Sequence, residues 1–358
     1  MNAVTGFLKA GFLNVAALCL CALPAGAEDW LLNAYLHPFE TGSPTRAIRY
    51  QPLDHAERPL RFCVLYPHLK DAYWLSVNYG MVQEARRLGV GFELFEAGGY
   101  PNLERQAEQV AACAGGGFDA MIIGTVSYDG LTPLIRDIGR TMPVIATVND
   151  IDPQGITAKS AVSWRDMAAE AGRVLARRHP RGSPPVRVAW FPGPKGAGWV
   201  HFVEQGFREA LRDSSAEIVV TKYGDTGREH QVLLVEEVLE EFPDIDYFVG
   251  NAPMADAAVS LTRDRDIGHR AGIISIYMTH GVFRGISRGR ILAAPNDFPV
   301  LQGRLAIEQA VRAVEGKLDI PHAGPRIIVT TPENISEAGA DQYLAPASFV
   351  ASFSVVAE

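Results

Sequence analysis

The sequence lacks the patterns by which most enzymes and metal proteins are recognised. Its 358 residues contain no H-E-x-x-H segment and no C-x-x-C segment, and the nine histidines are scattered singly. Metal sites need ligands at fixed short spacings, and hydrolases need a nucleophile beside a base. We therefore expect no catalytic residue, no nucleophile elbow, no metal and no cofactor.

Long apolar runs are also missing. No segment approaches the ~20 apolar residues that a membrane-spanning helix needs. The nearest is the run Phe12–Leu23, which follows the only early charge, Lys9, and ends at Pro24-Ala-Gly-Ala27. This order is typical of a secretory signal peptide. We predict cleavage after Ala27 and export of a soluble, periplasmic protein, because Cys19 and Cys21 lack the small-residue context of a lipoprotein cleavage site.

Basic residues do not outnumber acidic ones. The chain carries 33 Lys and Arg against 41 Asp and Glu, a formal net charge of −8. The predicted signal peptide contributes one lysine and no acid, so the mature chain is more acidic still. An acidic chain is repelled by nucleic acids and anionic membranes, and we expect neither as a partner.

Cysteine is scarce too, because only Cys63 and Cys113 follow the predicted signal peptide. In an oxidising compartment two such cysteines can pair. Cys63 opens a predicted strand, and a right-handed crossover would lay the predicted helix that ends near Cys113 across that strand. A disulfide and two inert buried thiols both fit this pattern.

Apolar strands alternate with amphipathic helices in two series, which indicates doubly wound parallel sheets. The first series has strands at 62–66, 91–96, 119–123 and 143–148 and helices at 75–88, 102–115 and 130–140. The second has strands at 186–191, 216–222, 245–249, 271–276 and 291–294 and helices at 165–179, 199–213, 228–241, 254–264 and 281–288. A helix at 299–315 and a strand at 326–330 follow. We predict an α/β fold of two lobes that clamp a ligand.

Turn residues at 149–155 interrupt the alternation, and we predict a hinge there. Residues 28–59, with one strand at 46–53, are predicted to lie on the first lobe as an extension. The predicted domains are a signal peptide (1–27), the N-terminal extension (28–59), an N-terminal lobe (60–149 and 298–320), a C-terminal lobe (150–297 and 325–340) and a C-terminal tail (341–358).

Polar and aromatic side chains gather where predicted strands end, the place where open α/β sheets bind ligands. The candidates are Asp71, Tyr73 and Trp74 after the first strand, Tyr100 after the second, Asn149 after the fourth, Trp164 at the start of the second lobe, Asn251 and Tyr277 after its strands, and Asp297 at a crossing. Aromatic faces with carboxylates suit a small cation or a methylated ammonium, and Tyr and Trp can donate to a ligand oxygen. The alternatives are ordinary core packing for the rings and capping or hinge bonding for Asn149 and Asp297.

A glycine-rich loop, Gly193-Pro-Lys-Gly-Ala-Gly198, follows a predicted strand and opens a helix, where anions can bind. It lacks the spacing of a P-loop or of a dinucleotide fingerprint. We interpret it as a tight turn that permits close contact between the lobes.

Five segments resemble the type I periplasmic binding proteins of the ribose-binding group. The longest is Leu65-Tyr-Pro-x-Leu-Lys-Asp-x-Tyr-Trp-Leu-Ser-x-Asn-Tyr-Gly80, and the others are Glu96-Ala-Gly-Gly-Tyr100, Pro192-Gly-Pro194, Glu204-x-Gly-Phe-Arg208 and Pro243-Asp-Ile-Asp246. The resemblance extends over roughly residues 60 to 335. It implies a two-lobe fold with three hinge crossings and no catalysis.

Within that family, the long segment is most similar to receptors for trimethylamine N-oxide that dock onto the periplasmic sensor domain of a membrane histidine kinase. The resemblance implies ligand contacts by Asp71, Tyr73 and Trp74 from one lobe. It implies further contacts by Asn251, Tyr277 and Asp297 from the other lobe and a crossing. Sugar binders usually place a carboxylate where Tyr277 stands, which disfavours a sugar. Trp199 stands where a small residue is expected.

Two alternatives stay open. A receptor for a sugar or another methylated amine that feeds an ABC transporter differs from a signalling receptor in its docking surface, which one sequence does not reveal. A secreted enzyme with its active site in the cleft would need an activated nucleophile or a metal, for which the sequence shows no residues.

Overall fold

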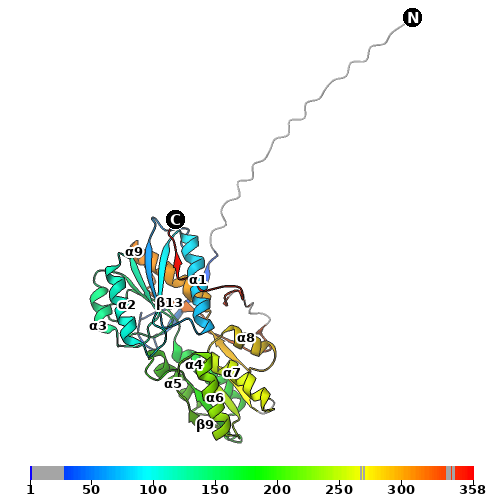
Figure 1. Cartoon of the computed structure of the whole chain (residues 1–358). Coiled ribbons are helices and arrows are strands. Elements are labelled where there is room, and N and C mark those ends of the chain that lie inside the picture. Colours follow the sequence, from blue (N-terminus) through cyan, green and yellow to red (C-terminus); the bar gives the residue numbers. More distant parts are fainter. Residues whose placement is uncertain (2–27, 267, 269–270, 336–339, 341–342) are drawn as a thin grey trace.

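The structure is a computed structural model that describes residues 1, 28–266, 268, 271–335, 340 and 343–358. The predicted signal peptide thus lies outside the described residues, apart from Met1. The described chain forms two α/β lobes stacked one above the other (Figure 1). The prediction of a two-lobe α/β fold is confirmed.

The N-terminal lobe is built on a mixed sheet with nine strands in the described part of the chain. From edge to edge these are β15 (Ser354–Val355), β4 (Gly91–Glu96), β3 (Arg61–Tyr66), β5 (Ala120–Ile123), β6 (Val144–Thr147), β7 (Ala158–Ser160), β13 (His322–Pro325), β1 (Trp30–Tyr35) and β2 (Thr45–Tyr50). Strands β4 to β13 run parallel, whereas β15, β1 and β2 are antiparallel to their neighbours. The central strands are parallel, as predicted. The antiparallel strands at both edges of the sheet were not predicted.

Helices cover both faces of this sheet because its central strands are apolar on both sides. On β3, Phe62 and Val64 belong to a cluster that includes residues of α1 (Ala72–Leu88) and α9 (Pro299–Val314). Cys63 and Leu65 point to the opposite face, as alternation along a strand requires. They pack with residues of α2 (Leu103–Gly115) and α3 (Thr132–Ile138).

The C-terminal lobe has a smaller, fully parallel sheet. Its strands are β11 (Gly272–Ser275), β10 (Tyr247–Gly250), β8 (Val186–Phe191) and β9 (Ala216–Thr221). The helices of this lobe are α4 (Trp164–Arg178), α5 (Gly198–Leu211), α6 (Arg228–Glu241), α7 (Ala252–Asp264) and α8 (His280–Ser287). A short antiparallel ribbon joins β12 (Ala294–Asn296) to β14 (Ile328–Thr330).

The described chain passes between the lobes three times, as predicted. The passages lie at 161–163 after β7, at 297–298 after β12, and at 326–327 after β13. The prediction of a hinge at 149–155 was wrong, because the chain first returns to the larger sheet as β7. Residues 158–160, which were assigned to the C-terminal lobe, therefore belong to the N-terminal sheet. The sequence does not predict strand β7, because the strand is only three residues long and carries Lys159 at its centre.

The N-terminal extension is part of the sheet rather than a segment lying on the lobe. It forms a hairpin of two strands, β1 and β2, and only a strand at 46–53 was expected. Strand β1 pairs with β13, so the hairpin extends the sheet at one edge. The tail residues Ser354 and Val355 extend the opposite edge by pairing with β4.

One close helix pair braces each lobe. A side chain at Gly80 of α1 would collide with the Val300 carbonyl of α9, and one at Gly303 would collide with the Val77 carbonyl. In the other lobe, a side chain at Gly206 of α5 would collide with the Arg165 carbonyl of α4. The two pairs hold α1 and α4, whose first turns carry candidate ligand-binding residues, in fixed positions.

Candidate ligand-binding site

A small cavity lies between the lobes, where strand ends of both sheets meet. Its empty space, part of which is open to solvent, is about 240 Å³. Its lining residues are Asp71, Tyr73, Trp74, Tyr100, Val148, Asn149, Trp164, Trp199, Thr226 and Tyr277. Seven of the nine predicted site residues line it, and Asn251 and Asp297 do not. The size suits a ligand of few heavy atoms.

Asp71 is the N-cap of helix α1, and its position fixes where the helix begins beside the cavity. Its side chain accepts a hydrogen bond from the Tyr73 backbone N–H at 3.0 Å, the usual bond of an N-cap. The helix therefore begins at Ala72, three residues earlier than predicted, and Tyr73 and Trp74 lie in its first turn rather than in a loop. Both rings are fixed by the helix and directed into the cavity wall.

Six aromatic rings form a closed circle around the cavity. Neighbouring ring centroids are 6.0 Å apart for Tyr73 and Trp74, 5.4 Å for Tyr73 and Tyr277, 5.8 Å for Tyr277 and Trp164, 5.1 Å for Trp164 and Trp199, and 6.0 Å for Trp199 and Tyr100. The Trp74 indole completes the circle by hydrogen bonding to the Tyr100 hydroxyl. Ring faces of this kind attract cations and methyl groups next to a positive charge.

Two buried carboxylates orient two of the phenols. Tyr277 donates to Asp71 Oδ2 at 2.5 Å, and Tyr73 donates to Asp297 Oδ2 at 2.7 Å. Burial raises the pKa of Asp71, against the hydrogen bonds from Tyr277 and the Tyr73 N–H. Burial also raises the pKa values of both phenols well above the ordinary value, so that both keep their protons.

Asp297 lies behind the wall rather than in it. Its Oδ2 also accepts from Gln302 Nε2 at 2.7 Å, while Oδ1 is buried without a partner among the described residues. Burial raises the pKa of Asp297 from 3.8 to about 6, although bonds from Tyr73 and Gln302 oppose the shift. The carboxyl therefore positions Tyr73 from outside the cavity.

Asn251 also lies outside the cavity. Its Oδ1 accepts from the Met254 N–H at 3.0 Å, and its Nδ2 donates to the Phe191 carbonyl at 3.2 Å. These bonds cap α7 and leave the amide occupied. An asparagine at a strand end is equally suited to a ligand contact and to a cap, and here the structure uses it as a cap.

Asn149 and Trp164 hold the back of the cavity at the end of the N-terminal sheet. Asn149 Nδ2 donates to the Thr125 carbonyl at 2.7 Å and to the Tyr100 hydroxyl at 3.2 Å. Trp164 Nε1 donates to the Val148 carbonyl at 2.9 Å. Burial raises the pKa of Tyr100, and the bonds from Asn149 and Trp74 moderate the increase. The Tyr100 hydroxyl is the acceptor in both hydrogen bonds. Neither bond uses the hydroxyl proton of Tyr100.

Three lining residues were not among the predicted site residues. Val148 and Thr226 carry no sequence signal that separates them from other loop residues. Trp199 is an unusually bulky residue next to the glycine-rich loop, and its size is the signal that the sequence offers. Its indole N–H is buried without a hydrogen-bond partner among the described residues.

A buried contact joins the lobes beside the cavity. His68, which follows β3, lies 3.1 Å from Thr226 Oγ1 and 3.5 Å from Asp225 Oδ1 of the C-terminal lobe. Burial acts to raise the pKa of Asp225, but the hydrogen bond and charge of His68, together with the Thr226 N–H and the charge of Lys70, outweigh burial and lower it. Gly99 allows this approach, since a Cβ there would lie 3.1 Å from Asp225 Oδ2.

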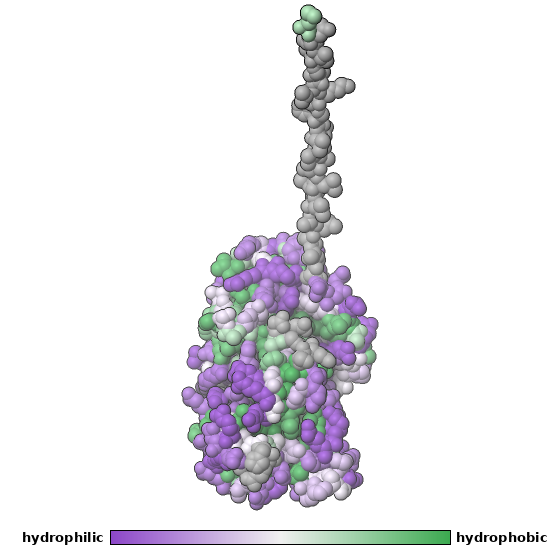
Figure 2. All heavy atoms as spheres, turned by 90° about the vertical axis from the view of Figure 1, so that its right-hand side faces the viewer, coloured by the Kyte–Doolittle hydropathy of each residue, from purple (hydrophilic) through white to green (hydrophobic). Residues whose placement is uncertain are grey.

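A wider hollow of about 950 Å³ adjoins the cavity through Asp71. Lys70 and Leu75 of one lobe, Arg228 and His280 of the other, and Phe349 of the tail contribute to its wall. Figure 2 shows apolar side chains gathered at mid-height on this side of the molecule, between more hydrophilic ends.

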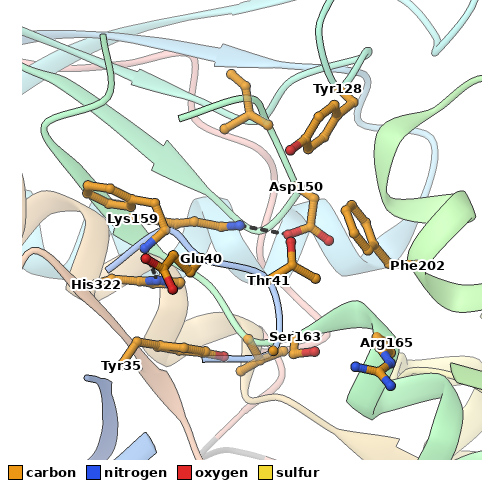
Figure 3. A pocket seen from close by; sticks show the side chains of 14 residues that line it. Tyr35, Glu40, Thr41, Tyr128, Asp150, Lys159, Ser163, Arg165, Phe202 and His322 are labelled. Carbon is orange, nitrogen blue, oxygen red and sulfur yellow. Dashed lines mark hydrogen bonds and ion pairs between the residues drawn. The ribbon is translucent and has the colours of Figure 1, made fainter. Parts of the chain in front are cut away.

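A second hollow, of about 440 Å³, lies at the crossings (Figure 3). Lys159 donates to Asp150 at 2.7 Å inside it, and His322 stacks on Tyr35 with ring centroids 3.8 Å apart. Burial, helped by the charge of Lys159, lowers the pKa of His322 to about 2. The neutral ring accepts from the Phe39 N–H at 3.0 Å, which fastens the N-terminal hairpin to the crossings.

The two cysteines after the predicted signal peptide form a disulfide. The Cα atoms of Cys63 and Cys113 lie 5.8 Å apart, within the usual range for a bridged pair. The bridge fastens α2 to β3 on the sheet face opposite α1.

Neither a nucleophile elbow nor a metal site is found in the described part of the chain. Gly285-Ile-Ser-Arg-Gly289 has the spacing G-x-S-x-G, which the expectation of no elbow overlooked. Ser287 ends helix α8 instead of joining a strand to a helix, and its hydroxyl donates to the Phe283 carbonyl at 2.9 Å. No group of three or more His, Cys, Asp or Glu in the described residues could hold a metal ion. No helix among them has the length and apolarity to cross a membrane.

Comparisons with known proteins show clear similarity. Residues 60–350 match a family model described as periplasmic binding proteins and sugar binding domain of LacI family. The chain is 36% identical to Periplasmic protein TorT of Escherichia coli (strain K12), over 93% of this chain and 94% of that protein.

Two solved structures are also similar. An ABC transporter solute binding protein from Bradyrhizobium sp. BTAi1 with bound bis-tris is 45% identical, with a TM-score of 0.77, over 91% of this chain and 98% of that chain. A chain of the TorS sensor domain–TorT complex in the presence of TMAO is 39% identical, with a TM-score of 0.75, over 82% of this chain and 99% of that chain.

Proposed function

Because this chain belongs to the periplasmic binding proteins and sugar binding domains of the LacI family, we propose that it is a periplasmic receptor for trimethylamine N-oxide. The ligand binds between the lobes, and the complex signals to the sensor domain of a TorS-like membrane histidine kinase. The resemblance identified from five sequence segments is confirmed at the level of the family, which is one of binding proteins and not of enzymes. We also propose that the chain reaches the periplasm through a signal peptide cleaved after Ala27.

The circle of six rings around a small cavity is the observation that carries this proposal. Trimethylamine N-oxide presents three methyl groups on a cationic nitrogen and one strongly accepting oxygen. The faces of Tyr73, Tyr277 and Trp164 suit the methyl groups, because ring quadrupoles attract the positive charge that these groups share. A sugar needs several donors and acceptors, and most polar groups of this wall are already bonded to protein.

Tyr100 is the proposed donor to the ligand oxygen. The hydroxyls of Tyr73 and Tyr277 donate to Asp297 and Asp71. The Tyr100 hydroxyl instead accepts from Asn149 and Trp74, so its own proton is available to the ligand. Two bonds accepted by one hydroxyl polarise it and strengthen its donation.

Asp71 acts on the ligand through charge and through Tyr277. A carboxylate cannot accept from a ligand that has no N–H or O–H group. Its negative charge balances the cationic nitrogen, and its bond to the phenol fixes the face of Tyr277 toward the cavity. Asp297 fixes Tyr73 in the same way. We propose that Asn149 supports Tyr100 and that Asn251 acts only as the cap of α7.

The test is calorimetric titration of the chain from Glu28 with trimethylamine N-oxide, and with trimethylamine, betaine and ribose as comparison ligands. We expect saturable binding of the N-oxide with a dissociation constant of micromolar order, about −8 kcal/mol. Trp74→Ala and Tyr277→Ala should each weaken binding at least ~10-fold, because each removes one face of the cage. Tyr247→Ala, at a ring of β10 that does not line the cavity, is the matched control. Binding of ribose in place of the N-oxide refutes the proposal.

Delivery to an ABC transporter is the second candidate function. It is favoured by the similarity to the solute binding protein from Bradyrhizobium, which exceeds the similarity to the TorS–TorT complex. The two functions share the ligand cavity and differ in the partner. A stable complex with a purified histidine-kinase sensor domain supports signalling, whereas ligand-dependent stimulation of a permease ATPase supports transport.

A further inference from the structure

Trp199 is the one ring of the circle that is absent from the predicted site residues. It lies in the first turn of α5, 5.1 Å from the ring of Trp164 and 6.0 Å from the ring of Tyr100. These two neighbours have no stacking contact with each other among the ring pairs of the described residues. Without the Trp199 indole the circle is open between them.

The glycine-rich loop makes room for this indole. Gly193 has φ +128°, and a Cβ at that position would lie 2.5 Å from Trp199 Cη2. A side chain would therefore exclude the indole from its present place, and the conformation itself favours glycine. The loop that precedes α5 is thus shaped around a large ring in the cavity wall. It also permits close contact between the lobes, as predicted, because a Cβ at Gly198 would lie 2.5 Å from Cβ of Tyr128 in the N-terminal lobe.

The indole N–H of Trp199 is unusual because it is buried and unpaired. Only 2% of the residue is exposed, and Nε1 has no hydrogen-bond partner among the described residues. The other two indoles of the wall donate to the Val148 carbonyl and to the Tyr100 hydroxyl. A buried N–H group without an acceptor is costly, and each such group calls for an explanation. Trp199 lines the cavity, so a bound ligand could supply the acceptor.

We infer that Trp199 determines the specificity of the cavity in two ways. Its N–H donates a second hydrogen bond to the ligand oxygen, beside that of Tyr100, and its ring limits the ligand to the size of a trimethylated nitrogen. This inference rests on the proposed function. If it holds, Trp199 is the residue by which the cavity distinguishes an N-oxide from a methylated ammonium that has no oxygen.

Tetramethylammonium separates the two parts of the inference, because it has the shape and the cationic nitrogen of the N-oxide but a methyl group in place of the negatively charged oxygen, and therefore a net charge of +1. Trp199→Phe keeps an aromatic ring, although a smaller one, and loses the donor. We expect its affinity for trimethylamine N-oxide to fall about 10-fold, the effect of one bond to a strongly charged acceptor. Its affinity for tetramethylammonium should stay within about 2-fold of the unsubstituted chain.

Trp190→Phe is the matched control. Trp190 Nε1 is also buried without a partner among the described residues, but its ring stacks on Phe207 in the core of the C-terminal lobe, at a centroid distance of 4.0 Å. We expect this variant to bind both ligands as the unsubstituted chain does. Indole N–H resonances of the unsubstituted chain give a measurement that needs no variant. One of the five should shift with the N-oxide and not with tetramethylammonium.

Trp199→Ala tests the limit on size. Removing the ring opens the circle, so triethylamine N-oxide, which the unsubstituted chain should reject, should bind the variant with measurable affinity. The inference is overturned if Trp199→Phe binds trimethylamine N-oxide as tightly as the unsubstituted chain does, or if no indole resonance distinguishes the two ligands. The proposed function fails separately, and the inference with it, if the unsubstituted chain binds neither trimethylamine N-oxide nor tetramethylammonium.

Discussion

Asp297 shows how a single buried carboxyl links the site to pH. It lies behind Tyr73, and burial raises its pKa from 3.8 to about 6. Between these values the folded chain holds a proton that the unfolded chain has lost. The free energy of unfolding therefore contains a contribution that is complete below pH 3.8 and is lost as pH rises through 6.

We predict that Asp297→Asn removes this contribution. Between pH 7 and pH 4 the unsubstituted chain should gain about 2 to 3 kcal/mol relative to the variant, since one pKa unit corresponds to ~1.4 kcal/mol. Urea unfolding at several pH values measures the difference. Asp244→Asn, at a residue whose side chain is 82% exposed, should keep the pH dependence of the unsubstituted chain. Parallel curves for the unsubstituted chain and Asp297→Asn would refute the assignment.

Residue by residue, the sequence predicts which side chains reach the cleft better than it predicts their partners. Asp71 and Asn251 are both polar residues at strand ends that cap the following helix. Asp71 lines the cavity and Asn251 does not, because the direction of a capping side chain depends on the packing of the whole helix. Trp199 lay outside the prediction for the same reason, since only the folded loop shows that its indole passes beside Gly193 into the wall.

At the scale of the elements, the packing of α1 against α9 positions two of the cage residues. Gly80 and Gly303 let the two helix backbones approach closely, and α1 carries Tyr73 and Trp74 in its first turn. We predict that Gly80→Ala forces the helices apart and lowers the free energy of unfolding by about 2 kcal/mol or more, the effect of overpacking. The displaced rings should also bind trimethylamine N-oxide more weakly.

Gly115→Ala is the control for this prediction. Gly115 ends α2, and a Cβ there would meet no atom within 4 Å. The substitution should leave stability unchanged or raise it slightly, since alanine restricts the unfolded chain. Denaturant unfolding and calorimetry of both variants provide the comparison. Equal stability of Gly80→Ala and Gly115→Ala would show that α1 and α9 can separate freely.

The sequence predicts the long helices and strands of this fold but not the short strands. Helices such as α1 and α6 and the apolar strands β3 and β8 carry their own periodicity, which is a local signal. Strands β7 and β13 have three and four residues and are strands only because they pair with each other and with β6 and β1. The pairing of β13 with β7 and with β1 joins residues more than 150 positions apart, and no local sequence pattern predicts it.

At the scale of the molecule, the site exists only when the lobes are together. The N-terminal lobe contributes Asp71, Tyr73 and Tyr100 to the cavity, and the C-terminal lobe contributes Trp199 and Tyr277. Any ligand that contacts both sets stabilises the closed arrangement over an open one. The apparent affinity must then depend on how readily the lobes close without ligand. The contact of His68 with Thr226 and Asp225 favours closure and lies outside the ring of aromatic residues.

We predict that Asp225→Asn weakens binding of trimethylamine N-oxide about 5-fold or more, because it removes a charged acceptor from the inter-lobe contact while leaving every cage residue in place. Small-angle scattering should show a larger radius of gyration for the variant without ligand, and saturating ligand should restore that of the unsubstituted chain. Asp213→Asn is the control, since its ion pair with Arg181 is exposed and lies within one lobe. If both variants bind and scatter alike, the contact beside the cavity does not control closure, and binding energy from the cage alone must hold the lobes together.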